Sequence, residues 1–322
     1  MKKKTRRFRF SLKTILIALT VTCVILAWYK YRVDRQKETV RQIYACGGSV
    51  VYDFGAVDPT NMTPRSSPWP DFLIKLLGVD AFHSPVTVRQ YDASKRYSGI
   101  SPTGKDFSPE LIERITKLPR VSAIQLYGGE DIDQWLAILG EMKQLGHLMI
   151  DNGRYVTDDG IAHLSELDNL AGLIVWRCQC TDRSLEIVSN LPEMIDLRLP
   201  YCDFSDEGVA HLAKLEKLRY LDISQTTFPV TVGQKKVNIR RTEDDSKFIT
   251  DKSVDTFEKI KSLTQLRIRH TGITTERQTQ FSKDRPGCKV DHSYAFRREE
   301  AGIDLDRLKL KQKKGARKSE RL

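Results

Sequence analysis

The sequence predicts an α/β solenoid of short repeats, preceded by one transmembrane helix. Three observations support this prediction: apolar residues that recur every 24 residues in the second half of the chain, a Ser/Thr-Asp pair that opens most repeats, and a nearly uncharged run close to the N-terminus. The chain has 322 residues, of which 40% are hydrophobic, and carries a formal net charge of +11. Roughly 250 residues are expected to form one folded domain, which is ample for a sizeable core.

Four clear repeats begin at Thr157, Thr181, Ser205 and Thr250, each followed by Asp. A hydroxyl at this place can accept a hydrogen bond from an early backbone N–H of a helix, and the carboxylate suits the positive end of the helix dipole. Apolar residues three apart then predict a short helix, and a step such as Leu221–Ile223 predicts a short strand. One repeat cannot bury its apolar side alone, so neighbouring repeats must stack.

The repeat domain is predicted to span residues 108–290. Ser108 opens an upstream copy, Ile132 a degenerate one, and Thr274 an incomplete last one, with start-to-start spacings of 24, 25, 24, 24, 45 and 24. The long spacing contains an insert, residues 229–249, whose two alternating segments predict a small hairpin. Val86–Val88 is a candidate for an additional strand nearer the N-terminus.

Several phrases of the chain resemble known repeats. Thr-Asp-Asp-Gly-Ile-Ala-His-Leu (157–164) and Ser-Asp-Glu-Gly-Val-Ala-His-Leu-Ala-Lys-Leu (205–215) look like leucine-rich repeats of the cysteine-containing type. In that type a Cys, Asn or Thr follows the strand, and the matching residues here are Cys178, Cys202, Thr226 and Thr271. The segment 7–14, Arg-Phe-Arg-Phe-Ser-Leu-Lys-Thr, is similar to the head of membrane-anchored repeat proteins common in planctomycete bacteria.

This resemblance covers roughly residues 6 to 90 and 108 to 280. It implies a leucine-rich-repeat solenoid with parallel strands on a concave face and short helices on a convex face. It also implies a membrane anchor and a binding role. It names no ligand, because such repeats serve many unrelated partners.

Residues 10–31 are predicted to be the transmembrane anchor. Between Phe10 and Tyr29 only Lys13 is charged, and a helix of this length spans about 30 Å, the thickness of a bilayer's hydrocarbon core. No small-x-small cleavage site follows the run, which favours an uncleaved signal-anchor over a cleaved signal peptide. A lipoprotein at Cys23 is disfavoured because this residue lies in the middle of the run.

Charge predicts the orientation of the anchor. Seven Lys and Arg residues without any acid precede the span, whereas five, diluted by two acids, follow it. The positive-inside rule therefore places residues 1–9, a basic tail, in the cytoplasm and the repeats outside it. The protein is thus predicted to be a single-pass protein of the bacterial cell envelope.

The positive charge belongs to the two ends of the chain. Residues 1–41 carry +10 and residues 297–322 carry +5, while the body between them carries −4. The last segment, residues 291–322, is predicted to be a basic disordered tail. A nucleic-acid partner is not expected, because such a partner favours a basic stripe on the folded domain itself.

Residues 32–107 are predicted to hold a juxtamembrane helix and an N-terminal cap. The pattern predicts a helix over 34–45, a strand over 49–53, a loop over 55–70 and a short helix over 71–77. Trp69 and Phe72 are expected to cover the end of the core.

Cysteines and histidines give little sign of chemistry. Cys178 and Cys202 occupy the same place in adjacent repeats, where a disulfide and a column of small buried side chains are both open interpretations. Cys178 and Cys180 are too close in sequence for a usual zinc pair, so no metal is expected. Catalytic motifs such as G-x-S-x-G and H-E-x-x-H do not occur, so the chain is interpreted as a non-enzyme without a cofactor.

The remaining candidate is a binding surface on the concave face. Residues that flank the buried pair of each strand should point out of this face, and Trp, Tyr and Arg there often carry interface energy. The candidate residues are Trp176, Arg198, Tyr201 and Tyr220, which should cluster, with Tyr127, Arg267 and Arg269 farther along. We expect a protein partner, with a cell-envelope polymer as a second candidate. Two alternatives stay open: a cytoplasm-facing adaptor whose basic ends contact nucleic acid or anionic lipid, and an enzyme accessory subunit that uses the insert.

Overall fold

The computed structural model describes residues 12–53, 55–56, 70–90, 107–225, 227–232, 235–240 and 248–291. The predicted basic tail over 1–9, Trp69, and the predicted tail over 291–322 except Asp291 lie outside this part of the chain; Asp291 is the last residue of a strand. The chain divides into two units, Met1–Cys178 and Gln179–Leu322, which are described one at a time.

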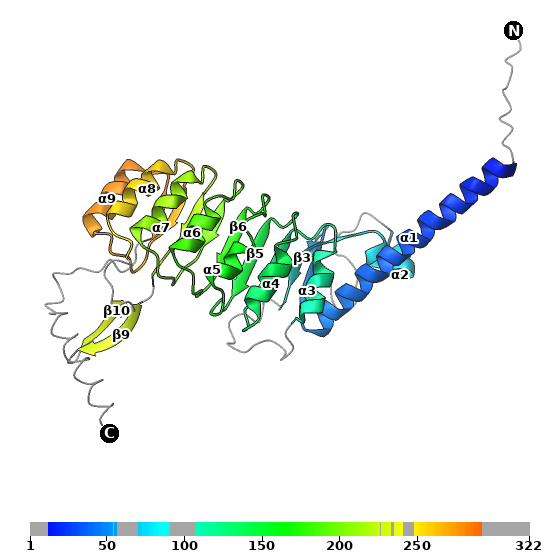
Figure 1. The fold of residues 1–322 in the computed structure, drawn as a ribbon, viewed down its shortest axis with the longest axis horizontal. Helices are drawn as coiled ribbons and strands as arrows, with labels where there is room; N and C mark the ends of the chain where they lie inside the picture. The colour runs from blue at the N-terminus through cyan, green and yellow to red at the C-terminus, as the bar shows by residue number, and fades with distance from the viewer. Residues whose placement is uncertain are drawn as a thin grey trace, which may run out of the picture. The chain divides into compact units, whose positions relative to one another are not determined.

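The first unit begins with a long helix and continues as strand-helix repeats. Its elements are α1 (Leu12–Ala45), β1 (Ser49–Tyr52), β2 (Gly55–Ala56), α2 (Asp71–Leu77), the 3-10 helix η1 (Val79–Ala81), β3 (Pro85–Arg89), α3 (Pro109–Thr116), β4 (Ala123–Tyr127), α4 (Ile132–Leu139), β5 (His147–Asp151), α5 (Asp158–Ala162) and β6 (Gly172–Val175). Strands β3 to β6 pair in parallel. Strand β1 pairs antiparallel with both β3 and β2 and so ends the ladder with a cap. Helices α3, α4 and α5 cover one face of these strands (Figure 1).

The second unit repeats the same arrangement. Its elements are α6 (Asp182–Val188), β7 (Asp196–Arg198), α7 (Asp206–His211), the 3-10 helix η3 (Leu212–Lys214), β8 (Tyr220–Asp222), β9 (Thr227–Val232), β10 (Lys235–Arg240), α8 (Lys252–Lys259), β11 (Gln265–Arg267), α9 (Thr275–Asp284) and β12 (Lys289–Asp291). Strands β7, β8, β11 and β12 pair in parallel. The predicted hairpin is confirmed as β9 and β10, with Val232 opposite Lys235, although it begins at Thr227 rather than at residue 229.

The apolar repeat positions form the core, as the spacing predicts. Leu197, Leu221 and Leu266, one from each of three adjacent strands, are at most 2% exposed. The other apolar positions of the four clear repeats are at most 3% exposed, apart from Phe228, whose side chain lies outside the described part. Both Cys178 and Cys202 are buried as well. A strand and a short helix per repeat of about 24 residues is the architecture of a leucine-rich repeat.

The Ser and Thr residues that open the repeats cap their helices. The hydroxyls of Thr157, Thr181, Ser205 and Thr274 accept hydrogen bonds from backbone N–H groups two or three residues ahead. In the repeat that opens at Thr250 the helix begins one residue later, after Asp251, and the Thr250 hydroxyl still accepts from the Lys252 N–H at 3.4 Å.

The Asp residue at the second position of four repeats has a role that the sequence did not reveal. Its carboxylate reaches the opening residue of the next repeat and accepts hydrogen bonds from the N–H and the hydroxyl of that residue. The pairs are Asp133 with Thr157, Asp182 with Ser205, Asp206 with Thr250 and Asp251 with Thr274. Interaction with the helix dipole alone is therefore an incomplete explanation of these carboxylates.

The N-terminal region corrects three predictions. The segments predicted as an anchor and a juxtamembrane helix are one continuous helix, α1, because no Gly or Pro lies between them to end the first. Its apolar first half is exposed, and by length and composition it is able to cross a membrane. Phe72 does not cover the core: it is 68% exposed. Of the predicted loop over 55–70, Gly55–Ala56 is strand β2.

A buried polar cluster joins α1 to the cap. The Gln36 side chain donates hydrogen bonds to the Asp80 carboxylate at 2.9 Å and to the His83 carbonyl at 2.8 Å. The Tyr52 hydroxyl donates to the same Asp80 oxygen at 2.8 Å. Burial raises the pKa of Asp80 above its ordinary value, and these two donors lower it in part. These hydrogen bonds fix the second half of α1 to strand β1 and to the 3-10 helix η1.

Candidate recognition surface

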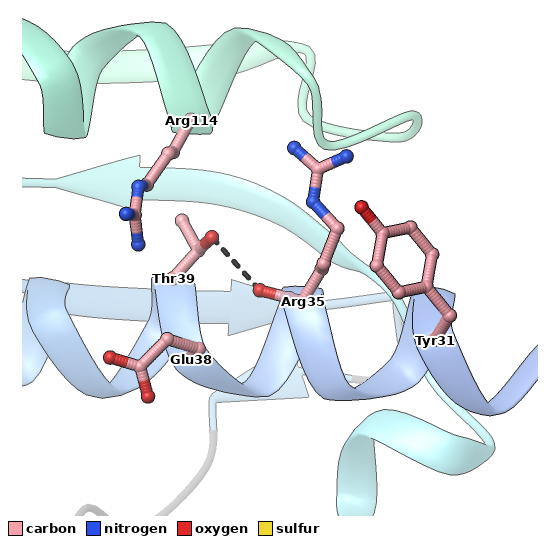
Figure 2. Close-up of a pocket in the computed structure, with 5 residues that line it drawn as sticks. All are labelled: Tyr31, Arg35, Glu38, Thr39 and Arg114. Carbon is pink, nitrogen blue, oxygen red and sulfur yellow. Dashed lines mark hydrogen bonds between the residues drawn. The ribbon is translucent and has the colours of Figure 1, made fainter.

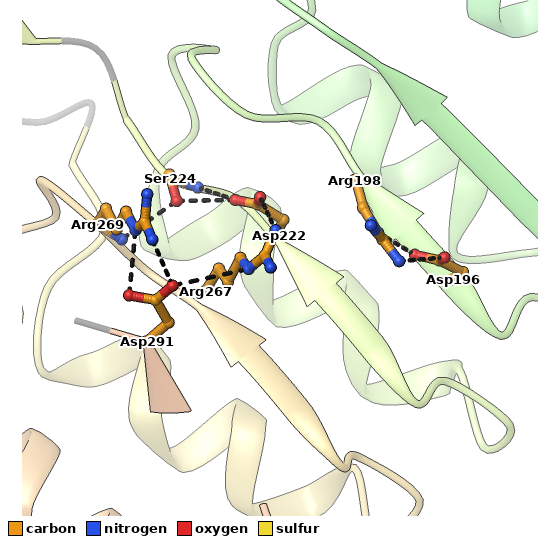
Figure 3. A network of polar contacts seen from close by, with 7 residues as sticks. All are labelled: Asp196, Arg198, Asp222, Ser224, Arg267, Arg269 and Asp291. Carbon is orange, nitrogen blue, oxygen red and sulfur yellow. Dashed lines mark hydrogen bonds and ion pairs between the residues drawn. The ribbon is translucent and has the colours of Figure 1, made fainter. Parts of the chain in front are cut away.

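The face of each sheet opposite its helices carries the predicted site residues. Because side chains alternate along a strand, the residues next to the buried leucines point to this face. In the second unit these residues include Arg198 on β7, Tyr220 on β8, Arg267 on β11 and Asp291 on β12. We call this the strand-side face of the second unit (Figure 3).

Arg198 is held by two neighbours on this face. Its Nε and Nη2 donate to the two carboxylate oxygens of Asp196, both at 2.7 Å. Its guanidinium also lies 5.8 Å from the centroid of the Tyr220 ring. A bidentate ion pair and a cation–π contact together restrict the arginine to one geometry. The predicted proximity of Arg198 and Tyr220 is therefore confirmed.

A second group of charges lies on β8, β11 and β12. Arg269 donates to both oxygens of Asp291, at 3.1 and 2.6 Å, and this interaction raises the pKa of the guanidinium. Arg267 lies 3.8 Å from carboxylate oxygens of both Asp222 and Asp291. Asp222, only 5% exposed, accepts from the Ser224 hydroxyl at 2.7 Å. Figure 3 shows these contacts as one network. Three arginines thus face three carboxylates, and the surface is nearly neutral.

Two tyrosines are exposed in this region of the second unit. Tyr201 is 38% exposed and Tyr220 is 39% exposed. Tyr201 follows β7 with φ 70°, a left-handed conformation that is rare for a tyrosine. It also lies close enough to Arg269 to contribute to the raised pKa of that residue. The fold therefore fixes the backbone positions of three exposed or half-buried side chains: Tyr201, Tyr220 and Arg198.

The first unit carries the remaining candidates. Trp176 and Tyr127 are each half-buried on that unit, and the Tyr127 N–H donates to the Gln90 side chain at 2.7 Å. Near them, burial raises the pKa of Asp151 to about 6, and the Gln125 amide donates to its carboxylate at 3.1 Å.

Sequence reasoning missed the ion pairs of this surface. Asp196, Asp222 and Asp291 each pair with an arginine that the sequence analysis names as a candidate for partner binding. One signal was present in the sequence: Asp196 and Arg198 are two residues apart, which places both side chains on the same face of a strand. Among the described residues, no group of three or more His, Cys, Asp or Glu side chains is placed to hold a metal ion.

Comparisons with known proteins do not identify a family. No protein-family model matches the sequence, and no curated protein matches it. Among solved structures, the fold matches an internalin (inlF) from Listeria monocytogenes str. 4b F2365, with a TM-score of 0.33 and 12% identity. The match covers 61% of this chain and 60% of the length of that one. The fold assignment therefore rests on the strands, helices and buried repeat positions themselves.

Proposed function

We propose that this chain is a membrane-anchored, non-catalytic recognition protein of the planctomycete type, with its repeats outside the cytoplasm. Its partner is a protein, and the binding site is the strand-side face of the second unit around Arg198, Tyr201 and Tyr220. A cell-envelope polymer is the second candidate partner. We favour a protein because the surface combines paired charges of both signs with tyrosines.

The observation that carries this proposal is the fixed geometry of Arg198. Its ion pair with Asp196 and its contact with the Tyr220 ring hold a guanidinium and an aromatic ring side by side before any partner arrives. Side chains that are already ordered lose less entropy on binding. Arg and Tyr are also the residue types that most often dominate the energy of protein interfaces.

Membrane anchoring is supported by α1. The helix is long and apolar enough to span a bilayer, and the side chains of its apolar half are exposed rather than buried in the first unit. The excess of positive charge before the span favours a cytoplasmic N-terminus. Anchoring raises the effective concentration of the protein for any partner in the same membrane layer.

The orientation is tested first. A reporter that is active only outside the cytoplasm is fused to the C-terminus of the full chain, and a cytoplasm-only reporter is fused in parallel. Activity of the first reporter alone supports the proposal. Activity of the second alone contradicts it and favours the cytoplasmic adaptor.

The recognition surface is tested by site-specific photocrosslinking in cells. A photoreactive amino acid is placed at Tyr220 or, as a matched control, at Glu207, which is exposed on the helix side of the same unit. We expect one defined protein adduct from position 220 and none from position 207, and Arg198→Ala in the same chain should remove it. Equal adducts at both positions would contradict the assignment of this face.

A further inference from the structure

A small pocket lies beside α1 where the helix meets the folded part of the first unit. Its volume is about 340 Å³, and Tyr31, Arg35, Glu38, Thr39 and Arg114 line it. Figure 2 shows Arg114 extending from α3 toward α1, while Arg35 and Tyr31 extend from α1 beside it. Two guanidinium groups from different helices therefore border one pocket.

The pocket has an excess of positive charge. Neither Arg35 nor Arg114 forms an ion pair with a carboxylate in the part of the chain that the structure describes. Glu38 is the acidic residue of the lining, but it is engaged by Arg41 at 3.1 Å and by Gln42 at 2.9 Å. These hydrogen bonds lower the pKa of Glu38, so it stays ionised and paired at neutral pH. Arg35 lies over the Tyr31 ring, 5.6 Å from its centroid, and Arg114 is close enough to Glu38 to contribute to its lowered pKa. In the described residues neither guanidinium donates a hydrogen bond to a carboxylate, so both can still donate to an anion in the pocket.

The position of the pocket along α1 suggests the kind of anion. Arg35 lies six residues beyond Tyr29, the last residue of the apolar run, which is about 9 Å along a helix axis. The headgroup region on each side of a bilayer is roughly 5–8 Å thick, and an arginine side chain can bend toward it. With α1 in a membrane, Arg35 lies at the outer edge of the headgroup phosphates.

Helix α2 exposes further apolar side chains in the same unit. Its residues Phe72, Leu76 and Leu77 are 68%, 75% and 53% exposed. The Tyr29 hydroxyl donates to the carbonyl of Ala81, in the 3-10 helix that directly follows α2. This hydrogen bond joins the segment that follows α2 to the aromatic end of the α1 span, and a bilayer around α1 is a surface able to cover the exposed side chains of α2. A free phosphate ion would leave them exposed to water.

We propose that the pocket between α1 and α3 binds the phosphate of a membrane phospholipid through Arg35 and Arg114. Anionic headgroups should bind more tightly than choline headgroups, because a quaternary ammonium is repelled by the two arginines. The inference rests on the membrane anchoring proposed above. It gives the protein a fixed contact with the membrane surface, in addition to the span itself.

The test uses the full chain in detergent and native mass spectrometry during titration with phosphatidylglycerol. We compare the wild type with Arg35→Gln/Arg114→Gln, and with Lys117→Gln, which removes an exposed charge on the edge of the same helix pair. The double variant should bind phosphatidylglycerol at least about tenfold more weakly, since hydrogen bonds to charged groups contribute about 1.5–3 kcal/mol and 1.4 kcal/mol corresponds to tenfold. The control should stay within about twofold of the wild type, a difference of less than 0.5 kcal/mol. Circular dichroism checks that the variants are folded.

Two results would overturn the proposal. One is equal lipid affinity of the wild type and the folded double variant. The other is displacement of the lipid by millimolar inorganic phosphate with the same dependence on the two arginines, which would assign the pocket to a soluble phosphate. Retention of each protein in carbonate-washed membranes is measured in parallel. Loss of the wild type from these membranes contradicts the anchoring, whereas retention with unchanged lipid affinity contradicts the pocket alone.

Discussion

The carboxylate of Asp182 accepts two hydrogen bonds from Ser205, one from the backbone N–H at 2.8 Å and one from the hydroxyl at 2.5 Å. Ser205 in turn caps helix α7 by accepting from the N–H groups of Glu207 and Gly208. One repeat therefore fixes the helix start of the next through a single side chain. The same contact recurs between Asp206 and Thr250 at 2.8 and 2.5 Å.

Removal of this carboxylate should destabilise the second unit. Asp182→Ala leaves the Ser205 N–H and hydroxyl without their acceptor, and we expect a loss of about 1–3 kcal/mol in the free energy of unfolding. Asp168→Ala, at an exposed position, is the matched control and should change stability by less than about 0.5 kcal/mol. Chemical unfolding followed by circular dichroism measures both. Equal midpoints for the two variants would show that the contact is not stabilising.

The glycine of the same repeat is needed for the approach of Asp182. A Cβ added at Gly208 would lie 2.0 Å from the Asp182 carboxylate oxygen, so Gly208→Ala must displace this side chain. We expect Gly208→Ala to be destabilising by about 1–3 kcal/mol in the wild type and by clearly less in the Asp182→Ala background. Gly129→Ala, where nothing lies within 4 Å, is the control. Additive losses in the double mutant cycle would argue against this steric conflict.

Asp151 should make the stability of the first unit depend on pH. Burial raises its pKa to about 6, from an ordinary value of 3.8, so the folded state binds the proton more tightly than the unfolded state. Its contribution to stability is therefore fully present below about pH 4 and is lost as the pH rises through about 6. Asp151→Asn mimics the neutral form and should raise the melting temperature at pH 7.5 but not at pH 4. An effect of the same size at both pH values would contradict the assignment.

Tyr201 allows stability and binding to be separated. Its φ of 70° suits Asn, and Asn152 occupies the corresponding place after β5 with φ 56°. Tyr201→Asn should therefore preserve the free energy of unfolding better than Tyr201→Val, by about 1–2 kcal/mol, because a β-branched residue is strained in this conformation. Both variants should lose the adduct formed at position 220. An adduct that persists in the stable Asn variant would exclude Tyr201 from the recognition surface.

The fold was largely predictable because its signal is periodic. Each repeat offers several apolar positions at fixed spacing, so residues such as Leu197 and Leu221 are identified as core without knowledge of their neighbours. The hairpin of the insert and the cap strand β1 follow from similarly local patterns. Helix boundaries were less certain: nothing in the sequence between Tyr31 and Asp34 marks an end, and α1 continues through it.

The chemistry of the surface was less predictable because it depends on pairs far apart in sequence. Arg269 and Asp291 are 22 residues apart, and their contact follows only from the register of β11 and β12. The hydrogen bonds from the opening residue of one repeat to the Asp of the preceding repeat could not be predicted for the same reason. Phe72 is an error of another kind. It was predicted to cover the core because it is apolar and lies in the cap region, but its side chain is exposed.

The insert leaves the bonding between its flanking repeats unchanged. Asp206 binds Thr250 across 44 residues as Asp182 binds Ser205 across 23, and Leu221 pairs with Leu266 in the same parallel ladder. The strands on either side are joined as if the intervening segment were absent, so the length of the hairpin can change without breaking this ladder. Ile249, the last residue of the insert, is buried and belongs to the core. The hairpin is therefore where a foreign sequence, such as an epitope tag or a small fluorescent domain, can be spliced into the chain.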